Sequence, residues 1–66
     1  MRPIHKMSVF DLKLHDRILN SETKLIGQVV SIDETSYEYI EALVTWSDKS
    51  QSRLNMYDKN LYLIND

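Results

Sequence analysis

The side chains best suited to chemistry in this sequence are its aromatic residues. They are spread along the chain, at Phe10, Tyr37, Tyr39, Trp46, Tyr57 and Tyr62. Aromatic rings grouped around a cavity attract cations through their faces, so such a set can form a cage for a cation. Trp46 also fits a second role, because it alternates with Ile40 and Val44 along one expected strand and would then point into the core. Both roles stay open for Trp46 at this level.

A second group of residues is suited to contacting another protein. On the strand expected over residues 37–46, Tyr39, Glu41 and Leu43 occupy the positions opposite the core-facing ones. Apolar side chains exposed together on a strand indicate an interface. Tyr62, on the last expected strand, can join them. The sequence therefore predicts a protein-binding face made of Tyr39, Glu41, Leu43 and Tyr62, for a partner protein or for a second copy of the chain.

Catalysis and metal binding lack the residues that they need. His5 and His15 are ten residues apart, without a third ligand at metal-like spacing. The chain has no cysteine, and its single glycine, Gly27, excludes a glycine-rich phosphate loop. No serine lies in a nucleophile-elbow sequence. We therefore expect no catalytic residue, no cofactor and no metal, and a protein that is not an enzyme.

Charge is distributed unevenly along the chain, although the net charge is only −2. Residues 25–48 carry five acidic and no basic side chains, whereas residues 1–24 carry five basic and three acidic ones. A net acidic chain is a poor general binder of nucleic acid, because that affinity comes largely from Lys and Arg on phosphates. A local nucleic-acid face remains the alternative to the protein-binding face, and it would use Arg2, Lys6, Lys13, Arg17 and Lys24.

The elements that must position these residues are short strands. Alternation and β-forming residues predict strands over residues 17–20, 25–32, 37–46, 51–56 and 61–64. In the second of these, Ile26, Val30 and Ile32 are expected to share one face with Gln28. Gly27 indicates a bulge or a close backbone approach. Leu54 and Met56 are expected to face inward from the fourth.

The segments between the strands read as turns. Residues 33–36 and 47–50 are expected to be turns, residues 57–60 a 3₁₀ turn, and Ser8 the cap of a short turn that ends near Asp11. We assign residues 1–7 to a flexible tail and residues 8–66 to one domain. Five short strands with such connections predict an all-β, strongly bent small barrel.

Four stretches of the sequence resemble the SH3-like barrels of the Tudor and KOW kind. They are Asp-Leu-Lys-Leu-His-Asp-Arg-Ile, Ile-Gly-Gln-Val-Val-Ser-Ile, Leu-Val-Thr-Trp-Ser-Asp and Tyr-Asp-Lys-Asn-Leu-Tyr-Leu-Ile, within residues 11–64. The resemblance implies a five-stranded SH3-like barrel and, because Tudor-like domains bind methylated cations in aromatic cages, gives that role to the aromatic set. His15 and Lys49 replace two glycines of the pattern, so we expect both turns to use conformations open to ordinary residues.

A more distant similarity connects the chain with the type II dihydrofolate reductases. In that family, a Gln-Ile-Tyr stretch and a lysine line a central pore of a tetramer. Here Asn55, Met56 and Tyr57 fall at the Gln-Ile-Tyr positions, and Asn20 falls near the position of the lysine. The cation that would complement folate and cofactor anions is missing. A reductase-like pore enzyme, which would require a tetramer and cofactor binding, is therefore the last alternative, after the protein-binding and nucleic-acid-binding ones.

Residue usage and hydropathy add two expectations. The chain has no long apolar run and no signal-peptide core, which predicts a cytoplasmic location. The abundance of Ile, Lys, Asn and Tyr is typical of an AT-rich genome, in which small barrels of this kind are often phage or mobile-element products that act on a host protein. We expect a non-enzymatic module that contacts another protein.

Overall fold

The computed structural model describes residues 1–36 and 39–64, and among these the side chains of all but residues 9, 34–36, 39 and 40. The described chain is all-β, with two single-turn 3₁₀ segments. The elements run in the order β1 (Arg2–Pro3), η1 (Ile4–Lys6), η2 (Val9–Asp11), β2 (Arg17–Asn20), β3 (Ile26–Ser36), β4 (Tyr39–Trp46), β5 (Gln51–Arg53) and β6 (Leu61–Ile64).

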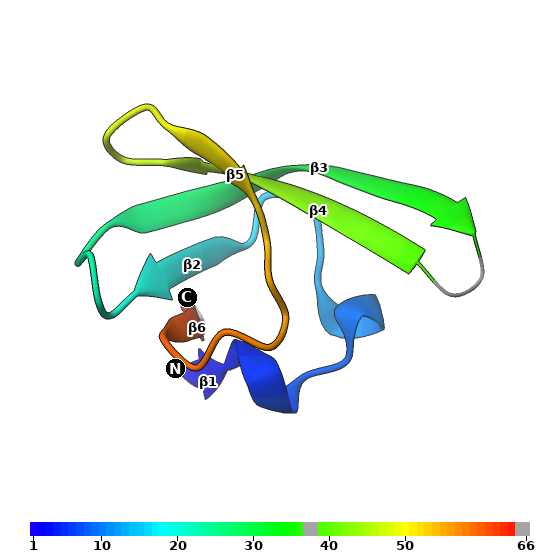
Figure 1. Ribbon diagram of the computed structural model, residues 1–66, viewed down its shortest axis with the longest axis horizontal. Helices are drawn as coiled ribbons and strands as arrows, with labels where there is room; N and C mark the ends of the chain where they lie inside the picture. Colours follow the sequence, from blue (N-terminus) through cyan, green and yellow to red (C-terminus); the bar gives the residue numbers. More distant parts are fainter. Residues whose placement is uncertain (37–38, 65–66) are drawn as a thin grey trace.

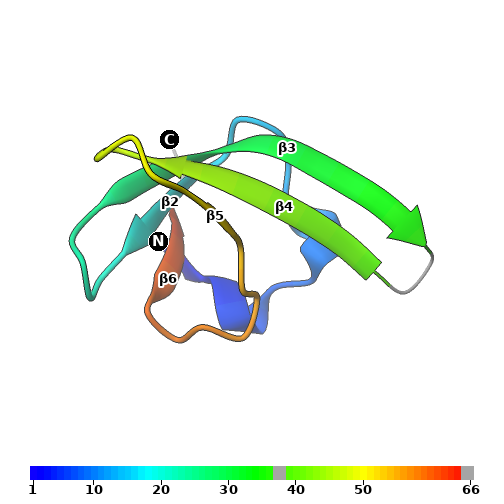
Figure 2. The ribbon, with the colours of Figure 1, turned by 45° about the horizontal axis from the view of Figure 1, so that its top comes forward.

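The strands form one antiparallel sheet in the order β1-β6-β2-β3-β4-β5. The long β3–β4 hairpin lies over β6, β1 and η1, and the chain after β5 runs down the near side (Figure 1). The same bend is visible from a second direction (Figure 2). The described part of the sheet has two free edges, β1 and β5, so it is strongly bent but not closed.

The core lies inside this bend. Among the described side chains it consists of eight buried apolar residues: Ile4, Leu12, Ile18, Val29, Ala42, Val44, Leu61 and Leu63. Half-buried Met7, Ile32, Trp46, Leu54 and Met56 pack against them. The predicted strand over 17–20 is confirmed, as are the last strand, the inward positions of Ala42, Val44 and Trp46, and the inward packing of Leu54 and Met56.

Strand β3 departs from the predicted alternation, because Ile32 does not share a face with Ile26 and Val30. Val29 is fully buried, whereas Ile26 is 45% and Val30 40% exposed, so these two point outward. The register shifts between Val29 and Ser31, where an extra residue interrupts the alternation before half-buried Ile32. A period-two pattern cannot anticipate such a bulge. Residues 33–36, expected to be a turn, continue β3 instead.

The first seven residues also differ from the expectation of a tail outside the domain. Arg2–Pro3 pairs with β6, and Ile4 is fully buried in the core. This pairing adds a sixth strand to the predicted five. The Ser8 turn is confirmed, because its Oγ accepts the Phe10 amide at 3.2 Å.

Two predicted turns take conformations other than those expected. His15 and Lys49 have φ values of 74° and 72°, in the left-handed region that favours glycine, and Lys24 has 66°. The expectation of ordinary conformations at His15 and Lys49 is therefore wrong, since both residues adopt the left-handed geometry that favours glycine. Residues 57–60 are not a 3₁₀ turn; the connection makes hydrogen-bonded turns from Asn55 to Asp58 and from Asp58 to Leu61.

Candidate functional site

The outward face of β3, β4 and β5 carries a shallow hollow next to the predicted binding residues. Leu43 pairs with Ser31 on one side and Arg53 on the other, and Glu41 pairs with Asp33. These five residues and Ala42 line a space of about 260 Å³, which we call the outer hollow. It places an aliphatic side chain beside two carboxylates.

The electrostatics of the outer hollow favour an incoming cation. Asp33 and Glu41 lie directly opposite each other on neighbouring strands, an arrangement that is unfavourable for like charges. One guanidinium nitrogen of Arg53 lies 3.4 Å from a Glu41 carboxylate oxygen. The Arg53 side chain is 77% exposed, so this ion pair is well screened by solvent. Two carboxylates against one guanidinium leave the hollow with a net negative charge.

The structure divides the predicted protein-binding face into two regions. Glu41 and Leu43 lie together at the outer hollow, and the side chain of Tyr39 is outside the described residues. Tyr62 lies on β6 and pairs with Leu19 of β2 and with Pro3 of β1, toward the opposite end of the strand order. Three strand spacings separate β6 from β4, about 14 Å along the sheet. Tyr62 therefore does not join Glu41 and Leu43.

Tyr62 belongs instead to an outward apolar row that the sequence did not reveal. Register places Pro3, Tyr62, Leu19 and Ile26 side by side across four strands. Only the pairing order brings these residues together, because they come from four separate segments of the chain.

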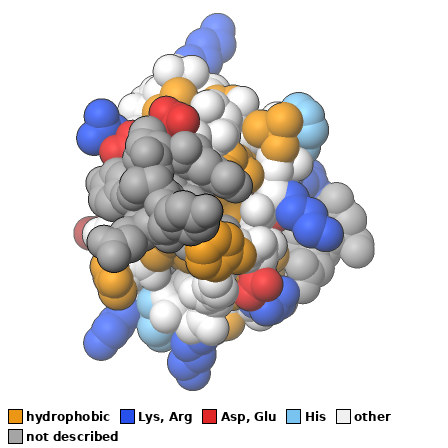
Figure 3. All heavy atoms as spheres, turned by 90° about the vertical axis from the view of Figure 1, so that its right-hand side faces the viewer, with side chains coloured by type: hydrophobic (Ala, Val, Ile, Leu, Met, Phe, Trp, Pro, Cys, Tyr) orange, Lys and Arg blue, Asp and Glu red, His pale blue; other side chains and the backbone are white. Residues whose placement is uncertain are grey.

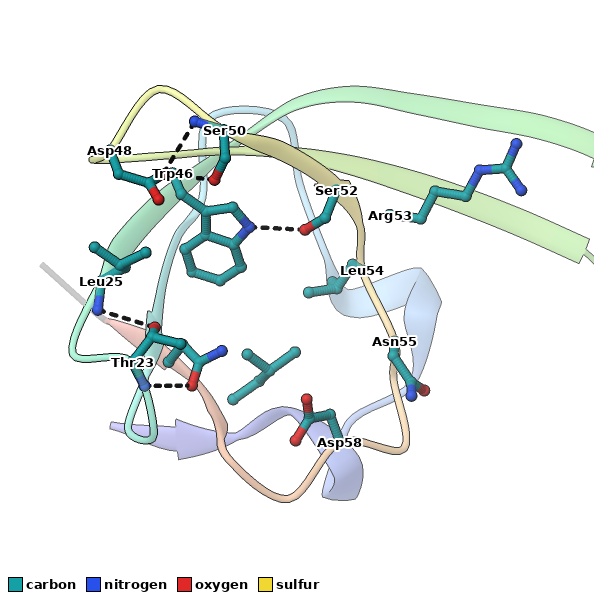
Figure 4. A pocket seen from close by; sticks show the side chains of 12 residues that line it. Thr23, Leu25, Trp46, Asp48, Ser50, Ser52, Arg53, Leu54, Asn55 and Asp58 are labelled. Atoms are coloured by element: carbon teal, nitrogen blue, oxygen red, sulfur yellow. Dashed lines mark hydrogen bonds between the residues drawn. The ribbon is translucent and has the colours of Figure 1, made fainter.

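A second hollow lies on the inner side of β5, where the sheet is open. This inner hollow has a volume of about 320 Å³, and its apolar part consists of Leu25, Trp46, Leu54 and Leu61. The Trp46 indole nitrogen donates a hydrogen bond to the Ser52 hydroxyl at 2.7 Å, while Asp48 and Asp58 lie at opposite ends of the hollow (Figure 4). Trp46 thus packs on the core with one part of its ring and borders solvent with another.

Local hydrogen bonds hold both carboxylates of the inner hollow. The Asp48 carboxylate accepts from the hydroxyl and the backbone amide of Ser50, and these bonds lower the pKa of Asp48 from its ordinary value. Asp58 accepts the Asn60 amide at 2.9 Å. This hollow was not predicted from the sequence. The one local sign of it there is the Asp48-Lys49-Ser50 turn, which is typical of a side-chain-capped hairpin.

The structure does not assemble an aromatic cage among the described side chains. Trp46 is the one aromatic residue that lines either hollow, Tyr57 is 87% exposed and Phe10 is 72% exposed. Tyr37 lies outside the described residues. Within the described part of the chain, the inner hollow therefore has one aromatic wall, and the rest of its lining is aliphatic, neutral polar and charged.

The five predicted basic residues lie on five different segments. Arg2 is on β1, Lys6 on η1, Lys13 in the loop before β2, Arg17 on β2 and Lys24 in the β2–β3 turn. Arg2 and Arg17 flank β6 from its two sides, through pairs with Leu63 and Ile64. At the hairpin end of the molecule, Lys and Arg side chains are dispersed around the rim (Figure 3).

The two histidines and the residues compared with the reductase pore (Asn20, Asn55 and Tyr57) do not form a common site among the described residues. His15 is exposed, while His5 is half-buried and its Nδ1 has no hydrogen-bond partner among the described residues. No group of three His, Asp or Glu side chains in the described chain is placed to hold a metal ion. Asn20 and Asn55 line the inner hollow, where their amide oxygens accept backbone amides of the adjoining turns, and Tyr57 points to solvent.

Comparisons with known proteins do not identify a family for this chain. No family model matches the sequence, and neither the curated proteins nor the solved structures searched contain a match. Among the described residues, no helix has the length and apolar character needed to cross a membrane.

Proposed function

We propose that this chain is an SH3-like module that binds another protein through the outer hollow and acts without catalysis. The observation that carries the proposal is the placement of Leu43 between Ser31 and Arg53, beside the opposed carboxylates Asp33 and Glu41. Apolar surface within a charged rim is the usual composition of a protein contact.

The arrangement of the sheet supports the SH3-like part of this proposal. Strands β2 to β5 follow one another as an antiparallel meander, and β6 returns to pair with β2. Gly27 lets the neighbouring strand pack closely on the second strand of the meander, because the Trp46 ring and Val44 occupy the space that a Cβ there would need. These features agree with the four stretches of the sequence that resemble SH3-like barrels.

The partner surface is expected to be basic. Asp33 and Glu41 present carboxylates at the hollow, and among the described side chains only Glu41 has a cationic neighbour there, the Arg53 guanidinium. A Lys or Arg of the partner would relieve the repulsion between the two carboxylates. Such complementarity mainly speeds association and selects partners.

A capture experiment tests the proposed face. The tagged 66-residue chain and its Leu43→Glu variant are incubated with lysate of the source cells, and bound proteins are quantified by mass spectrometry. Gln28→Glu is the matched control, since it adds the same charge at an exposed position of β3 outside the hollow. We expect at least one protein to be retained by the parent and by Gln28→Glu but reduced at least about tenfold by Leu43→Glu, as for a central interface residue. Equal retention of every protein by both variants would contradict the proposal.

A further inference from the structure

The two edges of the sheet differ in what they offer to another chain. The β1 edge consists of Arg2–Pro3, and Pro3 has no backbone N–H to donate. The β5 edge, Gln51–Arg53, contains no proline, and all three of its residues are exposed. An unprotected edge strand is a template for pairing with an extended segment.

The hydrogen bonds of the β4–β5 hairpin show which β5 groups are free for this pairing. The Trp46 amide donates to the Ser50 carbonyl and the Leu54 amide to the Ala42 carbonyl, both at 2.8 Å, and Val44 pairs with Ser52. In an antiparallel ladder, the residues between such pairs direct their N–H and C=O groups to the opposite side. Gln51 and Arg53 therefore direct their backbone groups away from β4, along the open edge.

The β5 edge runs between the two hollows. Arg53 lines both of them, with the outer hollow on the Leu43 side and the inner hollow on the Ser52 and Trp46 side. Successive side chains of an added strand point to opposite faces of the sheet. One side chain would thus enter the inner hollow, and the next would enter the outer hollow.

Both hollows prefer the same kind of side chain. Each has an aliphatic part and two carboxylates. These are Asp48 and Asp58 in the inner hollow, and Asp33 and Glu41 in the outer hollow. Among the residues that line the two hollows, these four carboxylates are accompanied by one basic side chain, that of Arg53. A lysine or arginine fits such a site, because its stem packs on apolar surface while its charge stays at the acidic rim.

We propose that the β5 edge binds an extended basic segment of the partner protein, which adds as a strand and places two successive Lys or Arg side chains in the two hollows. The inference rests on the proposed function, because it gives the mode of binding and the chemistry of that same partner. Backbone pairing supplies affinity in this mode, and the two hollows supply the preference for basic side chains.

Labelled synthetic peptides test the mode directly. The probe is the seven-residue peptide Thr-Val-Thr-Lys-Lys-Thr-Val with blocked ends, titrated with the full 66-residue chain by fluorescence anisotropy. One control replaces Lys-Lys by Glu-Glu, and another keeps both lysines but N-methylates their backbone nitrogens. We expect each control to bind at least about tenfold more weakly, the first through charge repulsion and the second through lost edge hydrogen bonds. In ¹⁵N-labelled protein, the Lys-Lys peptide should shift the amide signals of Gln51 and Arg53 and the indole signal of Trp46.

A pair of variants at one position separates edge pairing from charge. Arg53→Pro and Arg53→Ala both remove the guanidinium, but only proline removes the outward N–H, and neither touches a β4–β5 ladder bond. We expect Arg53→Ala to bind the Lys-Lys peptide as tightly as the parent or more tightly, and Arg53→Pro to bind it at least about fivefold more weakly than Arg53→Ala, for one lost hydrogen bond.

The outcomes distinguish the two proposals. Strand addition is overturned if the N-methylated peptide binds the unaltered protein as well as its parent peptide does, whatever the stability of the proline variant. The proposed function still stands in that case if Leu43→Glu loses its partner and Gln28→Glu does not. It fails with strand addition if Leu43→Glu retains every partner. Equal affinity for the Lys-Lys and Glu-Glu peptides overturns the basic chemistry of the segment.

Discussion

The two sides of this sheet differ in what holds them together. On one side, β1, β6 and β2 surround Ile4 and Ile18, both with no exposed surface, and proline occupies the edge. On the other, β5 is paired with β4 alone, all its residues are exposed, and two hollows border it. We call them the closed and the open side.

This difference shows how a 66-residue chain divides a small core. Domains of this size bury too little surface to stabilise every edge equally. Four of the eight buried apolar residues described, Ile4, Ile18, Leu61 and Leu63, come from η1, β2 and β6, whereas β5 contributes none, so the β5 edge depends on hydrogen bonds, turns and charges. Low local stability is a common property of binding segments, so the open side is the more suitable one for receiving a partner.

Removal of core atoms should distinguish the two sides most strongly. Ile4→Ala is expected to lower the free energy of unfolding by about 2–5 kcal/mol, because Ile4 is fully buried among apolar neighbours. That loss approaches the roughly 3–5 kcal/mol that a core of this size supplies. Leu54→Ala, at a half-buried residue of the open side, is the matched comparison and should have less than half the effect. Urea unfolding followed by circular dichroism measures both. Equal losses would contradict the difference between the two sides.

Gly27 lies on β3 between β2 and β4, and a methyl group there should cause the next largest loss of stability. A Cβ at Gly27 would overlap Val44 Cγ1 and lie 2.7 Å from Trp46 Cε3, closer than carbon atoms approach. We expect Gly27→Ala to lower the free energy of unfolding by about 1–3 kcal/mol and to alter the near-ultraviolet circular dichroism of Trp46. The exposed neighbour provides the control, since Gln28→Ala should stay within about 0.5 kcal/mol of the parent. An unchanged stability of Gly27→Ala would mean that Trp46 is not packed against β3.

The strands of this fold were predictable where alternation is regular, and less so elsewhere. On β4, Ala42, Val44 and Trp46 alternate without interruption, and their inward face was predicted correctly. On β3, the bulge after Val29 changes the alternation, and nothing in Val29-Val30-Ser31 indicates which valine is buried. Burial of Ile4 was not predictable either, because it depends on a pairing with β6 that spans almost the whole chain.

The candidate site was predictable only within one strand. Glu41 and Leu43 share a face of β4, and the period of two is sufficient to place them together. Tyr62 and the inner hollow depend on the order of strands in the sheet, which local patterns do not encode. The hollow takes Leu25, Trp46 and Leu61 from three segments that meet only through this order.

The turns at Lys49 and His15 allow a prediction of increased stability, which is made here for Lys49. Lys49 has a φ of 72°, at which a side chain is strained and glycine is not. Lys49→Gly should raise the free energy of unfolding by about 0.5–1 kcal/mol, because the relief exceeds the added freedom of the unfolded chain. The hydrogen bond that the backbone N–H of residue 49 donates to the Trp46 carbonyl is kept in this variant. Lys59→Gly removes the same charge at a residue without a positive φ and is expected to be neutral or destabilising. Thermal unfolding compares the two, and a loss in Lys49→Gly would contradict the role assigned to this turn.

Acid should weaken the open side through Asp48, with the smallest effect of the four. Hydrogen bonds from Ser50 lower the pKa of Asp48 in the folded chain, so its ionised form favours folding above the ordinary carboxyl pKa. That contribution is lost as the pH falls below about 4, through the folded pKa. Asp48→Asn keeps a side-chain oxygen for the turn but cannot titrate, so its melting temperature should fall less than that of the parent between pH 7 and pH 3. Ser50→Ala, which removes the hydroxyl partner, should reduce the fall in the same direction. None of the buried side chains that the structure describes is charged. A fall of equal size in the parent and in both variants would therefore place the acid sensitivity outside the β4–β5 hairpin and contradict the contrast between the two sides.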